Sequence, residues 1–451
     1  MIAIIKKICF LITGCVFFLS CKKYLDVKPD ERLVTPSSVK DLQAILDNEQ
    51  IFNNDYTPLG EIASDNYYLT AADWNSLAKL IADIYVWDPA VDFELSWGNM
   101  YQKVFYANVV LDHIDKVSNM QQLDRNAVKG SALFLRAFAF FKIAQVYALP
   151  YSGSTSSDLP GIPLILSSDI NTVYDRSSLA QTYERILSDL KSASELLPKI
   201  SMPLTRPNKA AAFALLSYIC LITGDYEKGV FYSDASLAIN SDLLDYNLIP
   251  STTNPFQRFN KEVLFQARQL SVPILSPARA KIDSTLYNLY ASNDLRKSLF
   301  FKSNNNGTYA FKGSYDANAT AANLFCGITT DEVYLIRAEC LARLGHTGDA
   351  MNWLNKLLHT RWKTNTYTDY SASTPEEALN IILEERRKEL VFRGGTRWAD
   401  IKRLASEPDR QIMLKRLIGS NQYLLPPGDL RYAFLIPSNV IQISGISQNK
   451  R

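Results

Sequence analysis

Histidine is scarce in this chain of 451 residues. Its three histidines, His113, His346 and His359, do not lie at the spacing of metal ligands, and no Cys-x-x-Cys motif occurs. Zinc in proteins is held by closely spaced Cys, His and carboxylate side chains. The sequence therefore predicts no metal site, and nothing in it indicates a cofactor.

The sequence also lacks the motifs of several enzyme classes. It contains no Gly-x-Ser-x-Gly elbow, no phosphate-binding loop and no dinucleotide fingerprint. A Ser-His-Asp triad needs only one histidine, so three histidines do not exclude one. The adjacent acids Glu384 and Glu385 are a poor catalytic pair, because neighbouring residues of a helix do not face each other. We therefore predict no catalytic residues.

Cysteine content and net charge set further limits. After residue 21 the chain has only Cys220, Cys326 and Cys340, and three cysteines do not make a disulfide framework. Pairing of Cys326 with Cys340 stays open, although buried free thiols fit better. The formal net charge of +2 falls to zero without the two lysines of residues 1–20. A neutral body argues against nucleic acid as the main partner, because phosphate binding needs clustered Lys and Arg.

An export signal opens the chain. Lys6 and Lys7 precede an apolar stretch at 8–19, and the sequence turns polar after Ser20-Cys21. This order is typical of a secretory signal, and 12 apolar residues are too few for a membrane span of about 20. Cysteine at the break predicts a lipoprotein: residues 1–20 are removed, and acyl chains on Cys21 hold the protein at a membrane. An ordinary signal peptide, or cleavage before Cys15, is the alternative.

Two segments of the body resemble each other. Residues 210–238 and 332–358 each combine an apolar helix, a glycine turn and a second helix with a small residue near its start. The turn glycines are Gly224 and Gly345, and the small residues are Gly229 and Ala350. This is the tetratricopeptide helix-turn-helix pattern, in which small residues let paired helices pack closely. The copies stand 121 residues apart, so any array is interrupted.

Periodicity and end signals predict the remaining elements. Further helices are expected near residue 37, over 97–117, 131–149 and 178–197, and from 375 to about 392. Residues 262–268 read as a strand, and 61–74, 303–320 and 424–451 as loops.

The most specific motif is Glu385-Arg-Arg-Lys-Glu-Leu-Val-Phe392, followed by Gly394 and Arg397-Trp398-Ala-Asp400. Further segments carry the same family resemblance as this motif. They are 20–29, 97–101 with Asn108, 132–147, 294–296, 331–339, 435–437 and Gln448-Asn449. Together they resemble the SusD/RagB family of nutrient-binding lipoproteins from Bacteroidetes outer membranes, over nearly the whole chain. Two departures concern local ion pairs: Arg393 stands where the family often has an acid, and no acid follows Pro437.

The resemblance implies a mostly α fold, a SusD-like α/α superhelix with tetratricopeptide-like pairs and long irregular loops, over residues 37–451. Its N-terminal part would span about 21–230 and its C-terminal part about 231–451, with a tether at 21–36. It also implies a cell-surface position on the outer membrane and a TonB-dependent transporter of the SusC type as partner. Ligands in this family are usually glycans, and peptides also occur.

Sugar binding needs exposed aromatic rings with amides and carboxylates beside them. The candidate ligand-binding residues are Trp74, Tyr67, Tyr68, Asp65, Asn66, Tyr309 and Tyr315. The turn at 64–66 has a structural alternative, which is to cap a helix or brace the loop. Trp87, Trp97, Phe392 and Trp398 are expected in the core, and the charges of 384–403 are expected to form ion pairs that lock the final helices.

Three function classes follow from these features. The first is a non-catalytic lipoprotein that captures an oligosaccharide or another nutrient for a transporter. The second is a periplasmic tetratricopeptide adaptor that binds peptides. The third is a helical glycoside hydrolase with two acidic residues, although no sequence feature locates such a pair.

Overall fold

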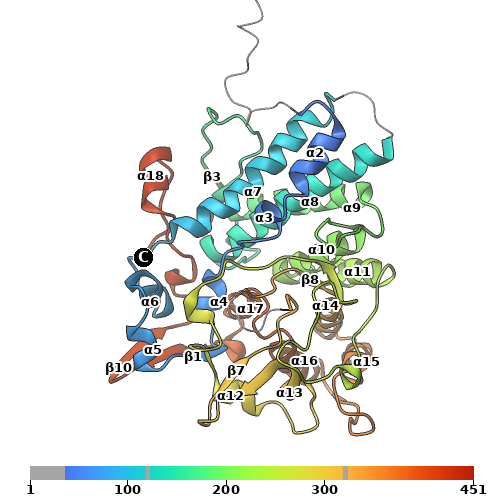
Figure 1. Ribbon diagram of the computed structural model, residues 1–451, viewed down its shortest axis with the longest axis vertical. Coiled ribbons are helices and arrows are strands. Elements are labelled where there is room, and N and C mark those ends of the chain that lie inside the picture. The colour runs from blue at the N-terminus through green and yellow to red at the C-terminus, as the bar shows by residue number, and fades with distance from the viewer. Residues whose placement is uncertain (1–35, 118–121, 318–322) are drawn as a thin grey trace, which may run out of the picture.

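The computed structural model describes residues 36–117, 122–317 and 323–451 (Figure 1). The predicted signal at 1–20, the predicted lipid site Cys21 and all but the last residue of the predicted tether lie outside these ranges. Within them, no helix is both long enough and apolar enough to cross a bilayer.

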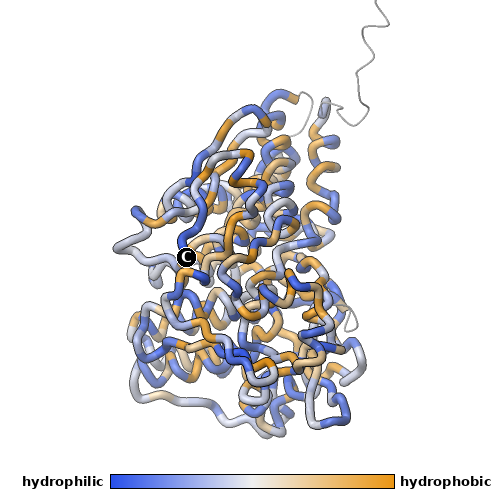
Figure 2. The backbone as a smooth tube through the Cα atoms, turned by 90° about the vertical axis from the view of Figure 1, so that its left-hand side faces the viewer, coloured by the Kyte–Doolittle hydropathy of each residue, from blue (hydrophilic) through white to orange (hydrophobic). Residues whose placement is uncertain are grey.

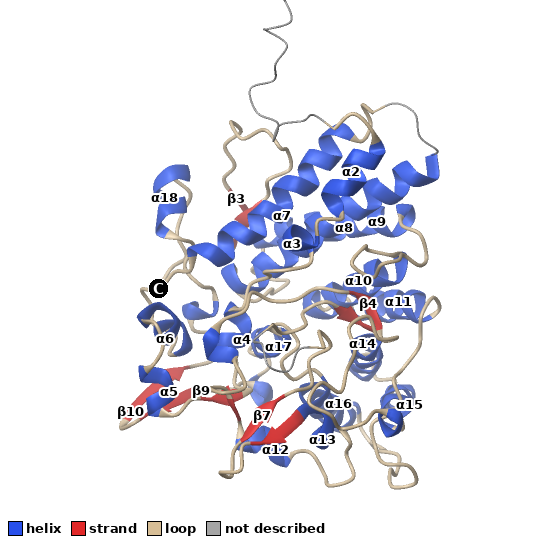
Figure 3. Ribbon diagram, in the orientation of Figure 1, coloured by secondary structure: helices blue, strands red, loops and turns tan. Residues whose placement is uncertain are grey.

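Most of the regular structure is helical, as the sequence predicts (Figure 3). The longer helices are α7 (Glu94–His113), α8 (Gln122–Tyr147), α9 (Leu179–Leu196), α10 (Lys209–Thr223), α11 (Tyr226–Leu237), α14 (Thr330–Arg343), α15 (Thr347–Leu358), α16 (Pro375–Glu389) and α17 (Thr396–Leu404). The shorter ones are α2 (Val39–Leu46), α3 (Glu49–Phe52), α4 (Leu59–Ala63), α5 (Ala71–Asn75), α6 (Lys79–Tyr85), α12 (Ser284–Asn288), α13 (Arg296–Phe300) and α18 (Ser438–Ser444).

The longer helices form a stack in which each packs against the next. α7 packs on α8, α8 on α9, α9 on α10 and α10 on α11. α14 then packs on α10 and α11, and α15 and α16 pack on α14. The two predicted repeats therefore lie side by side in space, and the long segment between them leaves the stack and returns to it.

Glycine permits the turns and the close approach of these hairpins. Gly224 and Gly345 have φ values of +79° and +84°, a region that residues with a Cβ avoid. Gly229 of α11 faces α14, where a Cβ would stand 2.6 Å from the Sγ of Cys340. The sequence predicts close packing of the two helices within a hairpin, but the tight contact at Gly229 is with the other hairpin, and Cys220 of its own hairpin lies at an ordinary 3.8 Å.

The strands form two-stranded antiparallel pairs, of which the described chain has five. They are β1 (Tyr67–Tyr68) with β5 (Lys281–Ile282), β2 (Pro160–Pro163) with β3 (Arg176–Ser178), β4 (Val263–Phe265) with β8 (Ile328–Thr329), β6 (Phe301–Ser303) with β7 (Tyr309–Phe311), and β9 (Leu414–Ile418) with β10 (Asn421–Leu425). The predicted strand at 262–268 is confirmed as β4. The three predicted loops are wrong in part, because 61–74 holds α4, β1 and α5, 303–320 holds β7, and 424–451 holds α18.

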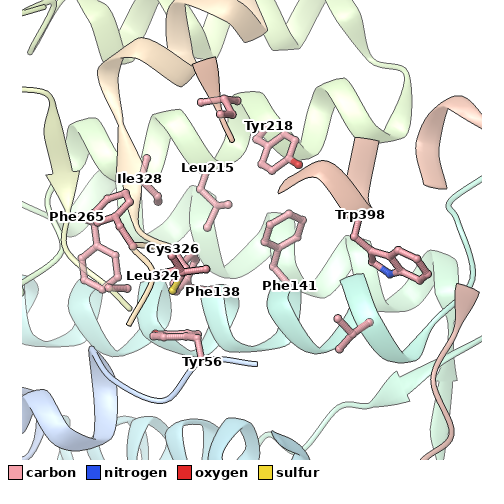
Figure 4. Close-up of a cluster of buried hydrophobic side chains, with 14 of the residues drawn as sticks. Tyr56, Phe138, Phe141, Leu215, Tyr218, Phe265, Leu324, Cys326, Ile328 and Trp398 are labelled. Carbon is pink, nitrogen blue, oxygen red and sulfur yellow. The ribbon is translucent and has the colours of Figure 1, made fainter. Parts of the chain in front are cut away.

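A continuous hydrophobic core joins residues from Val39 to Ile446. Figure 4 shows its centre, where Phe138 and Phe141 of α8 face Leu215 and Tyr218 of α10. Hydrophobic and hydrophilic positions alternate along the helices in Figure 2, as two-faced helices around a core require. The predicted core residues Trp87, Trp97, Phe392 and Trp398 are all buried, and Cys220, Cys326 and Cys340 are buried free thiols.

Charged side chains of α16 and α17 are buried as well, and they form the predicted ion pairs. Arg296 of α13 is fully buried and contacts three carboxylates. These belong to Asp294, Glu385 and Glu389, at N–O distances of 2.7, 2.6 and 3.0 Å. A second buried arginine, Arg361, contacts the other oxygen of Glu389 at 2.7 Å. The network therefore joins α13, α16 and the chain after α15.

The network continues through α14 and α17. Its further contacts are Arg361 with Glu262 (2.8 Å), Arg386 with Asp400 (2.9 Å), Arg403 with Glu339 (2.5 Å), Arg393 with Asp331 (3.1 Å) and Arg397 with Asp65 (2.6 Å). Arg393, the departure noted in the sequence, is therefore paired within the fold. Each charge of this network has an oppositely charged partner from another segment, which offsets the cost of its burial.

The contact between the hairpins predicts an unusual response to Gly229→Ala. In the wild type the added methyl group meets Cys340, so we expect unfolding free energy to fall by about 1–3 kcal/mol. In a Cys340→Ala background the same change should stabilise, because alanine favours a helix over glycine by about 1 kcal/mol. Urea unfolding of the four proteins measures this reversal, and equal effects in both backgrounds would contradict the contact.

The network also predicts a pH dependence centred on Glu339. Burial alone would raise the pKa of Glu339, but Arg403 and Arg343 outweigh burial and lower it from 4.5 to about 2. Stability from this carboxylate is therefore present above about pH 4.5 and is lost as the pH falls toward 2. Between about pH 6 and about pH 3.5, we expect the wild type to lose about 1 kcal/mol more unfolding free energy than Glu339→Gln. Parallel losses in the two proteins would refute this assignment.

Candidate functional site

Two of the predicted ligand-binding tyrosines belong to the core. Tyr67 and Tyr315 are 1% and 0% exposed. The Tyr67 ring packs near Phe392, and its hydroxyl donates to the carbonyl of Ile62. The Tyr315 ring lies 3.7 Å beneath the guanidinium of Arg393. Neither ring can pack on a sugar, so the prediction of these two residues as ligand contacts is wrong.

Asp65 and Asn66 brace the turn in which they lie. The carboxylate of Asp65 is held by Arg397 at 2.6 Å and by Arg387 at 3.2 Å. Burial would raise the pKa of Asp65, yet these arginines hold it well below its usual range. Asn66 is 1% exposed and donates to Glu61. The structural alternative for the 64–66 turn is therefore the correct one.

The remaining candidates lie at the surface. Tyr68 follows Tyr67 on β1, and because successive strand residues point to opposite faces, its ring turns outward and is 38% exposed. Trp74 of α5 is half-buried, and its indole N–H donates to the carbonyl of Ala82. Tyr309 of β7 is half-buried and stacks on Tyr287 of α12, with ring centroids 3.7 Å apart and planes 14° apart.

The fold gathers these rings at one end of the molecule, around β5. β5 pairs with β1 and packs against β7. Its Lys281 contacts Asp73 of α5 at 3.3 Å, and α12 follows β5 directly in the chain. Figure 1 shows α5, β1, α12 and β7 together at the lower left. We call the side chains of Tyr68, Trp74, Tyr287 and Tyr309 the aromatic surface.

Sequence reasoning missed Tyr287. It lies in a five-residue helix within an irregular stretch, and only its stacking on Tyr309 sets it apart from other tyrosines. Burial, with a hydrogen bond that Tyr287 donates to Tyr309, raises the pKa of Tyr287 to about 12. Its phenol therefore stays protonated at neutral pH and can both donate and accept a hydrogen bond.

Polar groups surround the aromatic surface. The turn between β6 and β7 exposes the side chains of Asn305 and Asn306, and Arg279 lies beside Ser76 near α5. Side-chain amides, which donate and accept at once, suit sugar hydroxyls. Aromatic faces with convergent amides are typical of a surface that binds a polyhydroxylated ligand.

A polar cleft of about 340 Å³ lies between α16 and α17. Glu384, Arg387, Arg410 and Leu289 line it among others. Glu385 points elsewhere, since its carboxylate is bound by Arg296 and Lys388. The two adjacent acids therefore diverge, as helix geometry predicts. Among the side chains that the structure describes, no cluster of three or more His, Cys, Asp and Glu could hold a metal ion.

Sequence comparisons place the chain among known proteins. Residues 23–221 match a family described as "Starch-binding associating with outer membrane", and residues 300–423 match the SusD family. A curated relative, SusD-like protein P2 from Formosa agariphila, is 25% identical over 414 residues, which are 76% of this chain and 79% of the relative.

Solved structures share the fold. A SusD superfamily protein from Bacteroides thetaiotaomicron is 22% identical and superimposes with a TM-score of 0.75, covering 92% of this chain and all of the other. Surface glycan-binding protein A from Bacteroides uniformis is 16% identical, with a TM-score of 0.71 over 91% of this chain and 98% of its own. The helical stack, the matched segments and these relatives agree, and the chain belongs to the SusD/RagB family.

Proposed function

We propose that this protein is a binding lipoprotein that captures an oligosaccharide on its aromatic surface and passes it to a TonB-dependent transporter of the SusC type. The observation that carries the proposal is the stacked pair Tyr287–Tyr309, which shares one end of the molecule with Tyr68 and Trp74. Family membership supports it, as does a structural relative named for glycan binding.

The chemistry of sugars favours such a surface. The C–H faces of a pyranose ring pack on aromatic faces, and its hydroxyls need donors and acceptors around the ring. The four rings come from four separate elements, which suits an extended chain of sugars better than a single ring. β1 and β7 are fixed by strand pairing and α5 by an ion pair, and Tyr287 of α12 is held by its stacking on Tyr309. The surface is therefore largely formed before ligand arrives.

The two other function classes make different demands. A glycoside hydrolase needs two carboxylates on either side of a sugar bond. The acids nearest the aromatic surface already have partners: Asp65 has Arg397, Asp73 has Lys281, and Asp283 accepts from the backbone N–H of Leu286. A periplasmic adaptor would use the concave side of its repeats for peptides, with no need for exposed rings at this end, so it does not explain the stacked tyrosines.

Loss of the stacked pair should abolish most of the glycan affinity. We expect Tyr287→Ala and Tyr309→Ala each to weaken binding by about tenfold or more, which corresponds to about 1.4 kcal/mol. An array of immobilised oligosaccharides identifies a ligand, and calorimetry then measures its Kd. Phe231→Ala is the matched control, because Phe231 is 64% exposed on α11, away from this surface.

Two results would contradict the proposal. One is an equal loss of affinity in the Phe231→Ala control and in the Tyr309→Ala variant. The other is release of shortened saccharides from the bound oligosaccharide by the pure protein, which would favour the hydrolase.

Attachment by Cys21 at the outer face of the outer membrane completes the proposal. Acyl chains contribute about 0.8 kcal/mol per buried methylene, so we expect Cys21→Ala to move the protein from the membrane fraction to the soluble fraction. Protease added to intact cells should degrade the wild type. Protection from protease would favour the periplasmic adaptor, and a Cys21→Ala protein that stays with the membrane would show that a partner holds it.

A further inference from the structure

An apolar groove lies far from the aromatic surface, between α18 and the loop at 164–175. Its volume is about 340 Å³, and Trp97 and Tyr101 of α7 line it together with Ile165 and Val440. The two rings are held in place, because Trp97 packs 5.0 Å from Tyr147 and the Tyr101 hydroxyl donates to the carbonyl of Pro163. The groove therefore has a fixed aromatic floor.

Aliphatic side chains stand out along both sides of this groove. Ile170 and Val173 on the loop are 85% and 81% exposed, and Ile443 on α18 is 86% exposed. All three line the groove, and Figure 1 shows α18 and the loop before β3 standing out from the body at the upper left. Exposed apolar groups gathered around a groove mark an interaction site.

The side chains that line the groove carry no charge. The 164–175 loop beside it carries two exposed acids, Asp169 and Asp175, and α18 carries no charged residue. Hydrogen bonds from Asn171 and Thr172 lower the pKa of Asp169, so it is ionised at neutral pH. A nearby cation, Arg176, is turned inward to the carbonyl of Gly161 and to Asn449. A complementary partner is therefore apolar at its centre and basic at its flanks.

The chain before the described body keeps that body close to the membrane. Pro36, where the described chain begins, is fifteen positions after Cys21, and an extended chain spans at most about 3.6 Å per residue. With Cys21 in the bilayer, Pro36 therefore stays within about 55 Å of the membrane. This keeps proteins of the same membrane close to the body.

A protein fits this groove better than lipid does. The concave, rigid floor takes an inserted side chain, whereas a bilayer would contact only the protruding Ile170, Val173 and Ile443 and leave the floor unfilled. Asp169 and Asp175 would lose hydration at a lipid surface without gaining partners, which is costly, while lysines or arginines of a protein would pair with them.

We propose that the groove between α18 and the 164–175 loop docks an apolar, basic-flanked segment on the extracellular side of the outer-membrane transporter. This inference rests on the proposed function, because it assigns a surface to the partnership named there. The aromatic surface and the docking groove are then separate, so capture of ligand and attachment to the transporter can be altered independently.

The test uses the affinity-tagged full-length lipoprotein in its own cells. Complexes are isolated from detergent-solubilised outer membranes, and the co-isolated TonB-dependent barrel is identified and quantified by mass spectrometry. The variant Ile170→Ser/Val173→Ser/Ile443→Ser removes the apolar side chains, and we expect it to retain about a tenth or less of the transporter that the wild type brings down. Asp169→Lys/Asp175→Lys should also lower the yield.

A matched control removes exposed apolar groups elsewhere. Leu248, Ile200 and Met202 are 81%, 70% and 70% exposed, and their triple serine variant should isolate as much transporter as the wild type. All variants should bind oligosaccharide as the wild type does, which also shows that they are folded.

Three other results would contradict the docking site, the transporter partnership, or the choice of a protein over lipid. A groove variant that isolates as much transporter as the wild type overturns the docking site while the proposed function stands. A wild type that isolates no transporter overturns the partnership itself. The unlipidated protein can also be tested for binding to vesicles of phosphatidylethanolamine and phosphatidylglycerol. If the groove variant loses this vesicle binding but still isolates the transporter, the groove contacts the bilayer instead.

Discussion

The buried charges around α16 constrain the rest of this structure. Arg296, Arg361, Arg386 and Arg403 are each within 3.1 Å of two or more carboxylates. An unpaired buried charge costs several kcal/mol, so none of these side chains tolerates the absence of its partners. The arginines and their carboxylates come from the residue before β4, α13 and the turn before it, α14, α16, α17 and the chain after α15. These segments must be assembled together for any of them to be stable.

The same network positions the surface that we assign to ligand. Arg387 and Arg397 hold Asp65, and Tyr67 and Tyr68 of β1 follow two residues later. Asp294, bound by Arg296 and Lys388, fixes the chain just after α12 and Tyr287. Tyr68 and Tyr287 are therefore positioned in part by arginines behind them. Because rigid support holds the side chains in place beforehand, they lose less conformational entropy when ligand binds.

The sequence predicts the scaffold well because its signals are local. Helical periodicity, the Thr374-Pro375 start and the glycine turns depend on residues only a few positions apart. The aromatic surface depends on contacts that no local window contains. Tyr67 and Tyr68 are adjacent and identical, yet the register of β1 against β5 buries one and exposes the other. Tyr315 is lost to the core because Arg393, far along the chain, covers its ring.

The direct contact between α11 and α14 has a consequence for how this protein can evolve. The chain leaves the stack after α11 and returns at α14, so the stack closes whether the segment between them is long or short. That segment carries Tyr287 and Tyr309, two of the four rings of the aromatic surface. Buried residues of this segment, such as Phe265 and Phe300, belong to the same core as the helices and are fixed by it. Its exposed positions are free to change, so the ligand-facing surface can diverge while the helical scaffold is kept.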